Sequence, residues 1–182
     1  MELLYLWIDN DYKTIKNQSF NFSNHIEFTF KRTSKLNGKL FLKENPNYIE
    51  NFFDESSSLL KSDEEIKLNG GIVNITGIIG KNGVGKTNLI NFIIDVLTER
   101  NPLKGDLIIA FKDRENKSIK IFHTIQKLKL STVGSIKGFK VEKPILQIIT
   151  TNDYYPLKVP PAFVNNTNLI YYNPAFDLRD YP

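Results

Sequence analysis

The sequence lacks cysteine altogether, and this absence removes several kinds of chemistry. Disulfide bonds, thiolate zinc sites and thiol nucleophiles are excluded, and the composition is compatible with a reducing compartment. Only two histidines are present, so we do not expect a metal site built from several histidines. The excess of one charge is also small: 24 basic and 20 acidic residues give a formal charge of +4, which does not indicate obligate nucleic-acid binding.

Long apolar runs are missing as well. No stretch of the sequence approaches the roughly 18 apolar residues that a membrane-spanning helix needs. The first ten residues carry Glu2, only a short apolar run and no small-residue cleavage site, so a secretory signal is not expected. With 182 residues, of which 41% are hydrophobic, the chain can bury one sizeable core. We therefore expect a soluble, cytoplasmic protein with one globular domain and no membrane association.

The first part of the chain indicates antiparallel β-structure. The apolar run over residues 3–8 ends at turn-forming residues and predicts a buried strand. Polar and apolar residues alternate over 25–31, and a second short run covers 39–43. Together they predict a hairpin whose tight turn is Asn37-Gly38.

The middle of the chain changes character twice. Residues 44–69 are polar, which predicts a long surface connection with one short helix near 52–60. The β-branched run over 72–79 lies between glycines and predicts a central strand. From Lys86 to about Arg100, apolar residues recur at helical spacing, and Asn101-Pro102 stops the predicted helix. Later strands, including a second antiparallel group, are predicted over residues 106–111, 118–123, 125–130, 145–151 and 168–172.

One motif between the predicted central strand and the predicted helix carries recognisable chemistry. Its eight residues fit G-x-x-x-x-G-K-[ST], the phosphate-binding P-loop pattern, in the strand-to-helix setting that this pattern requires. The structural alternative is a glycine turn that only caps the helix. The residues of the motif are Gly80, Lys81, Asn82, Gly83, Val84, Gly85, Lys86 and Thr87.

The residue types in this motif follow from the charge of a polyphosphate. Backbone N–H groups surround such an anion only if the chain wraps closely around it, and side chains at Gly83 and Gly85 would obstruct that approach. The start of the following helix adds the positive end of its dipole. We expect the Lys86 ammonium to bridge the β- and γ-phosphates and to act catalytically, while the Thr87 hydroxyl ligates Mg²⁺. The motif therefore predicts binding of Mg²⁺ and a nucleoside triphosphate, and it leaves the choice between ATP and GTP open.

The segment from Thr76 to Ile90 resembles the ABC-type ATPase heads of the SMC, RecF and OLD-like AAA ATPase families, in which an Asn-Gly pair inside the loop and an Asn-Leu pair after it are common. The resemblance implies ATP as the nucleotide and adds Asn88 to the binding residues. It implies an α/β P-loop NTPase fold, with a central sheet, a P-loop helix and an antiparallel β subdomain. A basic residue early in such chains often reaches the nucleotide, so Lys13 is a candidate; an exposed turn lysine is the alternative.

Two parts of an ABC-type head are missing from the sequence. An acidic Walker B strand motif and a Ser-Gly-Gly signature loop do not occur; the nearest imitations are Ile93-Ile94-Asp95, inside the predicted helix, and residues 148–153, without the following Glu. We therefore interpret residues 1–182 as a single P-loop ATPase domain that is incomplete, the amino-terminal lobe of a longer protein. The resemblance implies that the completed site forms between two heads, so that ATP drives dimerisation, in DNA repair, chromosome maintenance or anti-phage defence, with DNA as a partner of the whole protein.

Two other functions are compatible with the same motif. One is a small nucleotide or metabolite kinase whose acidic residue is Asp106 or Asp153. The other is a module that binds nucleotide as a structural or regulatory ligand, without hydrolysis.

Weaker signals each have an ordinary structural explanation. Gln126 and Gln147 are candidates for a contact with Mg²⁺ but lack the sequence context. His25 and His123 fit packing or surface positions better than catalysis. The tyrosine pairs near the prolines fit loop packing better than base stacking. Several lysines suggest either a basic face for phosphates or the solvent side of a strand, and these are Lys127, Lys129, Lys137, Lys140 and Lys143.

Overall fold

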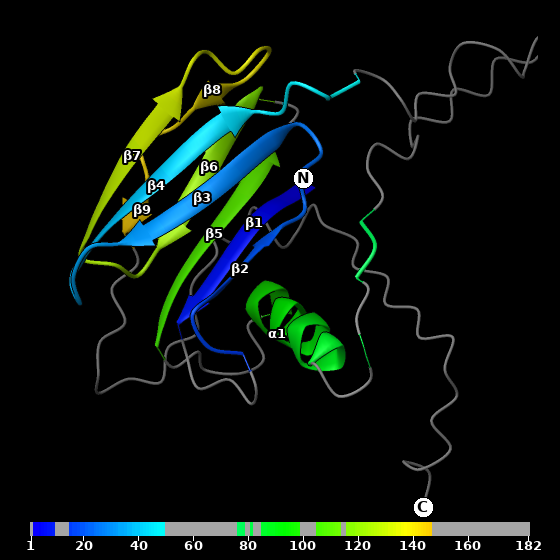
Figure 1. Cartoon of the computed structure of the whole chain (residues 1–182), viewed down its shortest axis with the longest axis vertical. Helices are drawn as coiled ribbons and strands as arrows, with labels where there is room; N and C mark the ends of the chain where they lie inside the picture. Colours follow the sequence, from blue (N-terminus) through cyan, green and yellow to red (C-terminus); the bar gives the residue numbers. More distant parts are fainter. Residues whose placement is uncertain are drawn as a thin grey trace, which may run out of the picture.

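The computed structural model describes residues 2–9, 15–49, 76–78, 81, 85–98, 105–113 and 116–146. These residues form a mixed α/β structure that consists mostly of strands, with one helix among them. Figure 1 shows three layers: a six-stranded sheet lies between the helix α1 and a second sheet of three strands. The α/β class expected from the sequence is therefore confirmed at this level.

The six-stranded sheet has β1 and β5 at its centre. Its order is β2-β1-β5-β6, and β8 and β9 pair one after the other with the far edge of β6. The pairs β1–β2, β1–β5 and β5–β6 are antiparallel, whereas β8 and β9 run parallel to β6. The strands are β1 (Glu2–Asp9), β2 (Gln18–Asn21), β5 (Asp106–Asp113), β6 (Ser118–His123), β8 (Lys140–Val141) and β9 (Ile145–Leu146).

The three-stranded sheet has the order β3-β4-β7, formed by β3 (Ile26–Arg32), β4 (Asn37–Glu44) and β7 (Lys127–Val133). The predicted hairpin of β3 and β4 is confirmed, but the prediction of its turn is wrong. The chain turns at residues 33–36, and Gly38 already pairs with Arg32 inside the ladder. A Cβ on Gly38 would lie 2.3 Å from Cε2 of Phe30, so this glycine makes room for an aromatic ring.

Two further sequence predictions need correction. The strand expected over 125–130 does form as β7, but it pairs parallel with β4 in the second sheet and does not extend the antiparallel pair β5–β6. Its Leu128 and Leu130 pack between the two sheets, which explains this choice of partner. The central strand expected over 72–79 is not found in its described part, because Thr76–Ile78 is exposed and has no strand pairing. The Thr76 hydroxyl instead donates to the Phe22 carbonyl at 3.1 Å.

The central strands are buried on both faces because each face meets a different layer. In β1, Leu6 and Ile8 point to the helix, whereas Tyr5 and Trp7 point to the second sheet. Strand β5 repeats this alternation, as the period of two in a strand requires. The helix-side core consists of Leu6, Ile8, Ile15, Leu89, Phe92, Val96, Leu107, Ile109, Phe111 and Phe122.

The helix α1 (Lys86–Thr98) confirms the predicted helix and its first residue. Leu89, Phe92 and Val96 are buried against the six-stranded sheet, at a spacing that places them on one side of the helix. The helix does not reach the length and apolarity of a membrane span, and the described residues contain no other helix. The predictions over 52–60, 147–151 and 168–172 lie outside the described residues.

An arginine connects the two sheets at one end. Arg32, the last residue of β3, donates to the carboxylates of Asp9 and Asp106, which lie at the paired ends of β1 and β5. Its guanidinium also donates to the Lys35 carbonyl at 2.7 Å and lies 5.5 Å from the Trp7 ring centroid. One partly buried cation thus offsets two carboxylates that would otherwise repel each other.

Candidate functional site

The start of α1 is built by a glycine in a conformation that other residues avoid. Gly85 has a φ of 92°, in the region that L side chains rarely adopt. Its carbonyl accepts the first helical hydrogen bond, from Leu89 N at 2.9 Å. The last glycine of the motif is therefore needed to let the chain turn directly into the helix.

The Lys86 side chain folds back over the segment that precedes the helix. Its Nζ donates to the carbonyl oxygen of Lys81 at 2.8 Å. The Lys86 ammonium group therefore lies beside the backbone of Lys81, five residues earlier in the chain.

The electrostatics at this end of α1 favour an anion. The first turn carries no acidic side chain, so nothing in it opposes the positive end of the helix dipole. Lys86 adds a full charge, and Thr87 is exposed with its hydroxyl at the second helical position. An ammonium, a helix start and an exposed hydroxyl fit a polyphosphate and its Mg²⁺. Of the other predicted binding residues, Asn88 lies in the first helical turn, while Gly80, Asn82, Gly83, Val84 and Lys13 lie outside the described residues.

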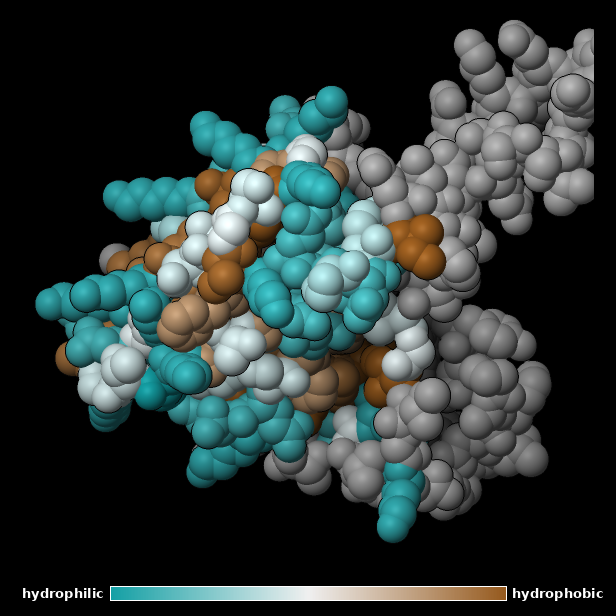
Figure 2. Space-filling view, turned by 45° about the horizontal axis from the view of Figure 1, so that its top comes forward, coloured by the Kyte–Doolittle hydropathy of each residue, from teal (hydrophilic) through white to brown (hydrophobic). Residues whose placement is uncertain are grey.

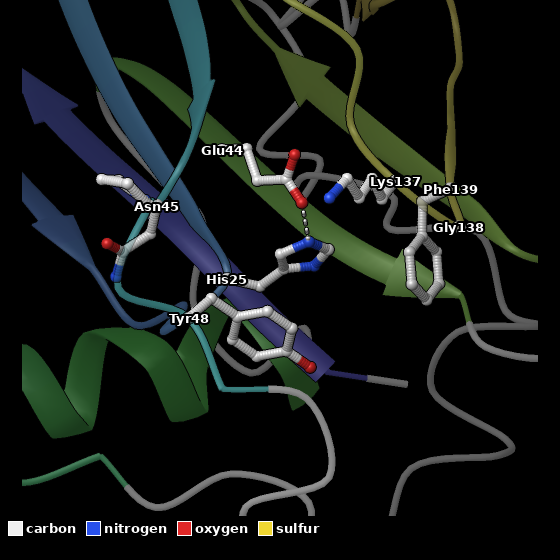
Figure 3. Close-up of a pocket in the computed structure, with 8 residues that line it drawn as sticks. His25, Glu44, Asn45, Tyr48, Lys137, Gly138 and Phe139 are labelled. Carbon is white, nitrogen blue, oxygen red and sulfur yellow. Dashed lines mark hydrogen bonds and ion pairs between the residues drawn. The ribbon is translucent and has the colours of Figure 1, made fainter.

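A pocket of about 440 Å³ lies at the three-stranded sheet, at the open end of the β3–β4 hairpin, where β3 begins and β4 ends (Figure 3). His25 is buried in its wall, and its Nε2 lies 3.2 Å from Oε1 of Glu44. Tyr48 stacks on the imidazole with ring centroids 4.3 Å apart, and Phe139 meets it edge-on at 6.2 Å. The remaining lining residues are Asn45, Pro46, Lys137 and Gly138.

The His25–Glu44 pair has the surroundings of a packing element. Nδ1 of His25 is buried and has no hydrogen-bond partner among the described residues, so it offers no open edge to a substrate. Among the described residues that line the pocket there is no serine, threonine or cysteine that the imidazole could activate. The sequence-based preference for a packing role of His25 agrees with these contacts.

The other weak candidates also have structural contacts. His123 is buried, its Nδ1 lies 2.8 Å from the Ile125 carbonyl, and burial lowers the pKa of its ring. Asp106 is held by Arg32 and by the Thr124 hydroxyl. Gln126 is exposed at a bend before β7. Gln147, Asp153 and the tyrosine pairs lie outside the described residues, and the described residues contain no group of three or more acidic or histidine side chains suited to a metal ion.

The lysines suggested as a basic face are not brought together as a set. Lys127 and Lys129 lie exposed on β7, but Lys140 belongs to β8 in the other sheet and Lys137 lines the pocket. Lys31, Lys39 and Lys43 share the outer side of the second sheet with the two β7 lysines. The alternation over 25–31 and 39–43 predicts that these three lysines lie on the exposed side of their strands. It does not predict which strands are neighbours in the sheet.

Comparison with known proteins adds no identity. No protein-family model matches the chain, and no curated protein or solved structure is significantly similar to it.

Proposed function

We propose that this chain binds Mg·ATP through the loop that leads into α1. The observation that carries the proposal is the hydrogen bond from the Lys86 ammonium to the Lys81 carbonyl, next to a glycine whose positive φ starts the helix. An ammonium held beside the Lys81 backbone, at the positive end of a helix dipole, fits the P-loop pattern in residues 80–87.

Each residue of the proposed site has a distinct task. Lys86 exchanges its carbonyl partner for the β- and γ-phosphates and neutralises their charge. Thr87 ligates the Mg²⁺ ion, and the backbone of the loop, with Lys81 and Gly85 at its described ends, supplies N–H donors. The bound nucleotide supplies the phosphoryl group, and Asn88 and Lys13 are further proposed contacts.

The wider proposal follows the resemblance of the loop to ABC-type ATPase heads. As the amino-terminal lobe of such a head, the domain would be completed by a second lobe and a second head, and ATP hydrolysis would then drive their association and release. Hydrolysis also needs an acidic residue near the phosphates. The first turn of α1 contains no acidic residue, so this residue would have to come from another part of the protein. DNA repair, chromosome maintenance and anti-phage defence are the proposed settings.

Nucleotide-dependent melting tests the binding proposal. At about a hundredfold excess of Mg·ATP over its dissociation constant, the ligand stabilises the fold by about 2.7 kcal/mol. For a chain of this size the melting temperature should rise by about 5–10 °C. Lys86→Ala should abolish this rise and the calorimetric binding signal, whereas Lys117→Ala, in the β5–β6 turn, should leave both unchanged.

The same preparations separate the alternatives. Transfer of phosphate from ATP to a small molecule by the isolated chain would favour the kinase. A melting shift without any turnover would fit both the incomplete ATPase lobe and the regulatory binding module. Unchanged affinity in Lys86→Ala would contradict the assignment of the site.

A further inference from the structure

The outer side of the three-stranded sheet carries a dense group of lysines, which we call the lysine face. Alternation in β4 buries Leu40 and Leu42 against the other sheet and turns the residues between and beside them outward. The same alternation in β3 and β7 turns their lysines to this side. The lysine face consists of Lys31, Lys39, Lys43, Lys127 and Lys129, and Figure 2 shows long hydrophilic side chains projecting from the strand-built part of the surface.

The strand register brings three of these charges into one row. Lys31 pairs with Lys39 across β3 and β4, and Lys39 pairs with Lys129 across β4 and β7. Like charges directly opposite each other destabilise a sheet. None of the five lysines forms an ion pair within the described part of the chain. Folding therefore works against this arrangement, and a ligand that binds the charges would relieve the cost.

The lysine face has a strongly positive local charge. Glu27, opposite Lys43, is the acidic side chain on this side of the sheet, so five lysines and one glutamate give a local formal charge of +4. The whole sequence also carries +4, from 24 basic and 20 acidic residues, which leaves 19 of each for the rest of the chain. Among the described residues, 16 are basic and 8 are acidic, so this one sheet surface holds half of their excess charge of +8, and it attracts polyanions.

An aromatic ring lies in the middle of the lysine face. Phe41 follows Lys39 on the same side of β4, and the Nζ atoms of Lys39 and Lys31 lie 4.7 and 5.8 Å from its ring centroid. The ring pairs across the sheet with Thr29 and Ser131, two small polar residues, and is itself partly exposed. A flat basic surface with a central aromatic ring suits a chain of phosphates whose bases stack.

We propose that the lysine face binds single-stranded nucleic acid, with phosphates on the lysines and one base stacked on Phe41. Neighbouring strands are about 4.8 Å apart and alternate residues in a strand about 6.7 Å apart, spacings comparable to the distance between successive phosphates. The lipid bilayer is the less suitable polyanion, because the face offers few apolar side chains for insertion. This proposal uses none of the residues of the nucleotide site. The nucleotide-binding and nucleic-acid-binding proposals can therefore be tested independently.

The test measures binding of the whole chain to a fluorescein-labelled oligothymidylate of about 20 nucleotides by fluorescence anisotropy at several salt concentrations. The variant Lys31→Gln/Lys39→Gln/Lys129→Gln removes the row of charges. Its affinity at low salt should fall at least about tenfold, and the slope of log K against log salt should become about 2 units shallower. Because like-charge repulsion is removed, this variant should melt no lower than the wild type.

A charge-matched control decides whether position matters. Lys117→Gln/Lys140→Gln/Lys143→Gln removes the same charge from other elements and should stay within about twofold of the wild type in affinity. Phe41→Ala should weaken binding about tenfold without changing the salt slope, since stacking releases no counterions. Equal losses in both triple variants, absence of binding by the wild type at low salt, or binding to phosphatidylserine vesicles but not to the oligonucleotide would overturn the proposal.

Discussion

At the scale of single residues, Asp113 shows how local hydrogen bonds set a charge. Asn116 donates to its carboxylate from both its side-chain amide and its backbone N–H, and the Lys120 ammonium lies 2.7 Å from Oδ2. These contacts, with Asn116 foremost, hold the pKa of Asp113 well below its ordinary value. The carboxylate is therefore stabilised more in the folded chain than in the unfolded chain.

The pH dependence of stability follows from the sign of this shift. Asp113 contributes its full stabilisation above the pKa of the unfolded residue, about 4, and this contribution declines as the pH falls below that value. Asp113→Asn should lower the free energy of unfolding by about 1–3 kcal/mol at pH 7. In urea unfolding, the difference between variant and wild type should narrow steadily from pH 4 toward pH 2. A difference that stays constant over this range would contradict the assignment.

Two glycines show that a residue pattern alone does not determine the structural role of a glycine. Gly38 follows an asparagine, and Asn-Gly is a common hairpin turn, yet here the glycine lies in a strand beneath the Phe30 ring. Gly85 has a positive φ where the motif passes into the helix, so a glycine is needed there for the backbone conformation as well. The difference is that Gly85 is defined by its immediate neighbours in the chain, whereas Gly38 is defined by an aromatic ring on the adjacent strand.

At the scale of elements, α1 depends on its apolar side rather than on its ends. Neither its first turn nor its last carries charges that would support the helix dipole, so burial has to stabilise it. Phe92 is fully buried between the helix and the six-stranded sheet. Phe92→Ala should lower the free energy of unfolding by about 3–5 kcal/mol.

The matched control on α1 is the exposed Thr87, where substitution by alanine should change stability by less than about 0.5 kcal/mol. Chemical denaturation of the two variants makes this comparison directly. A loss below about 1 kcal/mol in Phe92→Ala would contradict the packing of α1 on the sheet.

Elements with a strong local pattern could be predicted from the sequence, and elements chosen by distant partners could not. The apolar run of β1 and the periodicity of α1 are visible in consecutive residues. Strand β2, with the sequence Gln-Ser-Phe-Asn, has no such pattern and exists because β1 supplies a pairing edge. The parallel pairing of β7 with β4 could not be predicted for the same reason, since 82 residues, 45–126, lie between the two strands.

At the scale of the whole molecule, Arg32 forms a charged contact between the two sheets. Its removal would leave Asp9 and Asp106 close together without a cation. Since the three side chains are only partly buried, Arg32→Ala should cost about 1–3 kcal/mol of unfolding free energy, less than a fully buried pair would.

A second substitution separates charge repulsion from lost packing on Trp7. Adding Asp106→Asn to Arg32→Ala should restore part of the stability, because one of the two repelling carboxylates is gone. Strictly additive losses in this double-mutant cycle, measured by denaturant unfolding, would show that the inter-sheet charges are not coupled.

The layers place the proposed nucleotide loop and the lysine face on opposite sides of the molecule. The loop leads into the helix layer, and the lysine face is the outer side of the second sheet (Figure 1). The site candidates could be read from the sequence only where they were contiguous, as in the loop. The lysine face required the register of three strands, two of which become neighbours only in the folded chain.

The most direct test of the nucleotide proposal is amide hydrogen exchange across residues 80–90, with and without Mg·ATP. If the loop surrounds the phosphates, nucleotide should slow the exchange of its N–H groups in the wild type. In Lys86→Ala, nucleotide should leave the exchange rates unchanged. Unaltered exchange in this segment of the wild-type chain at saturating Mg·ATP would contradict the account.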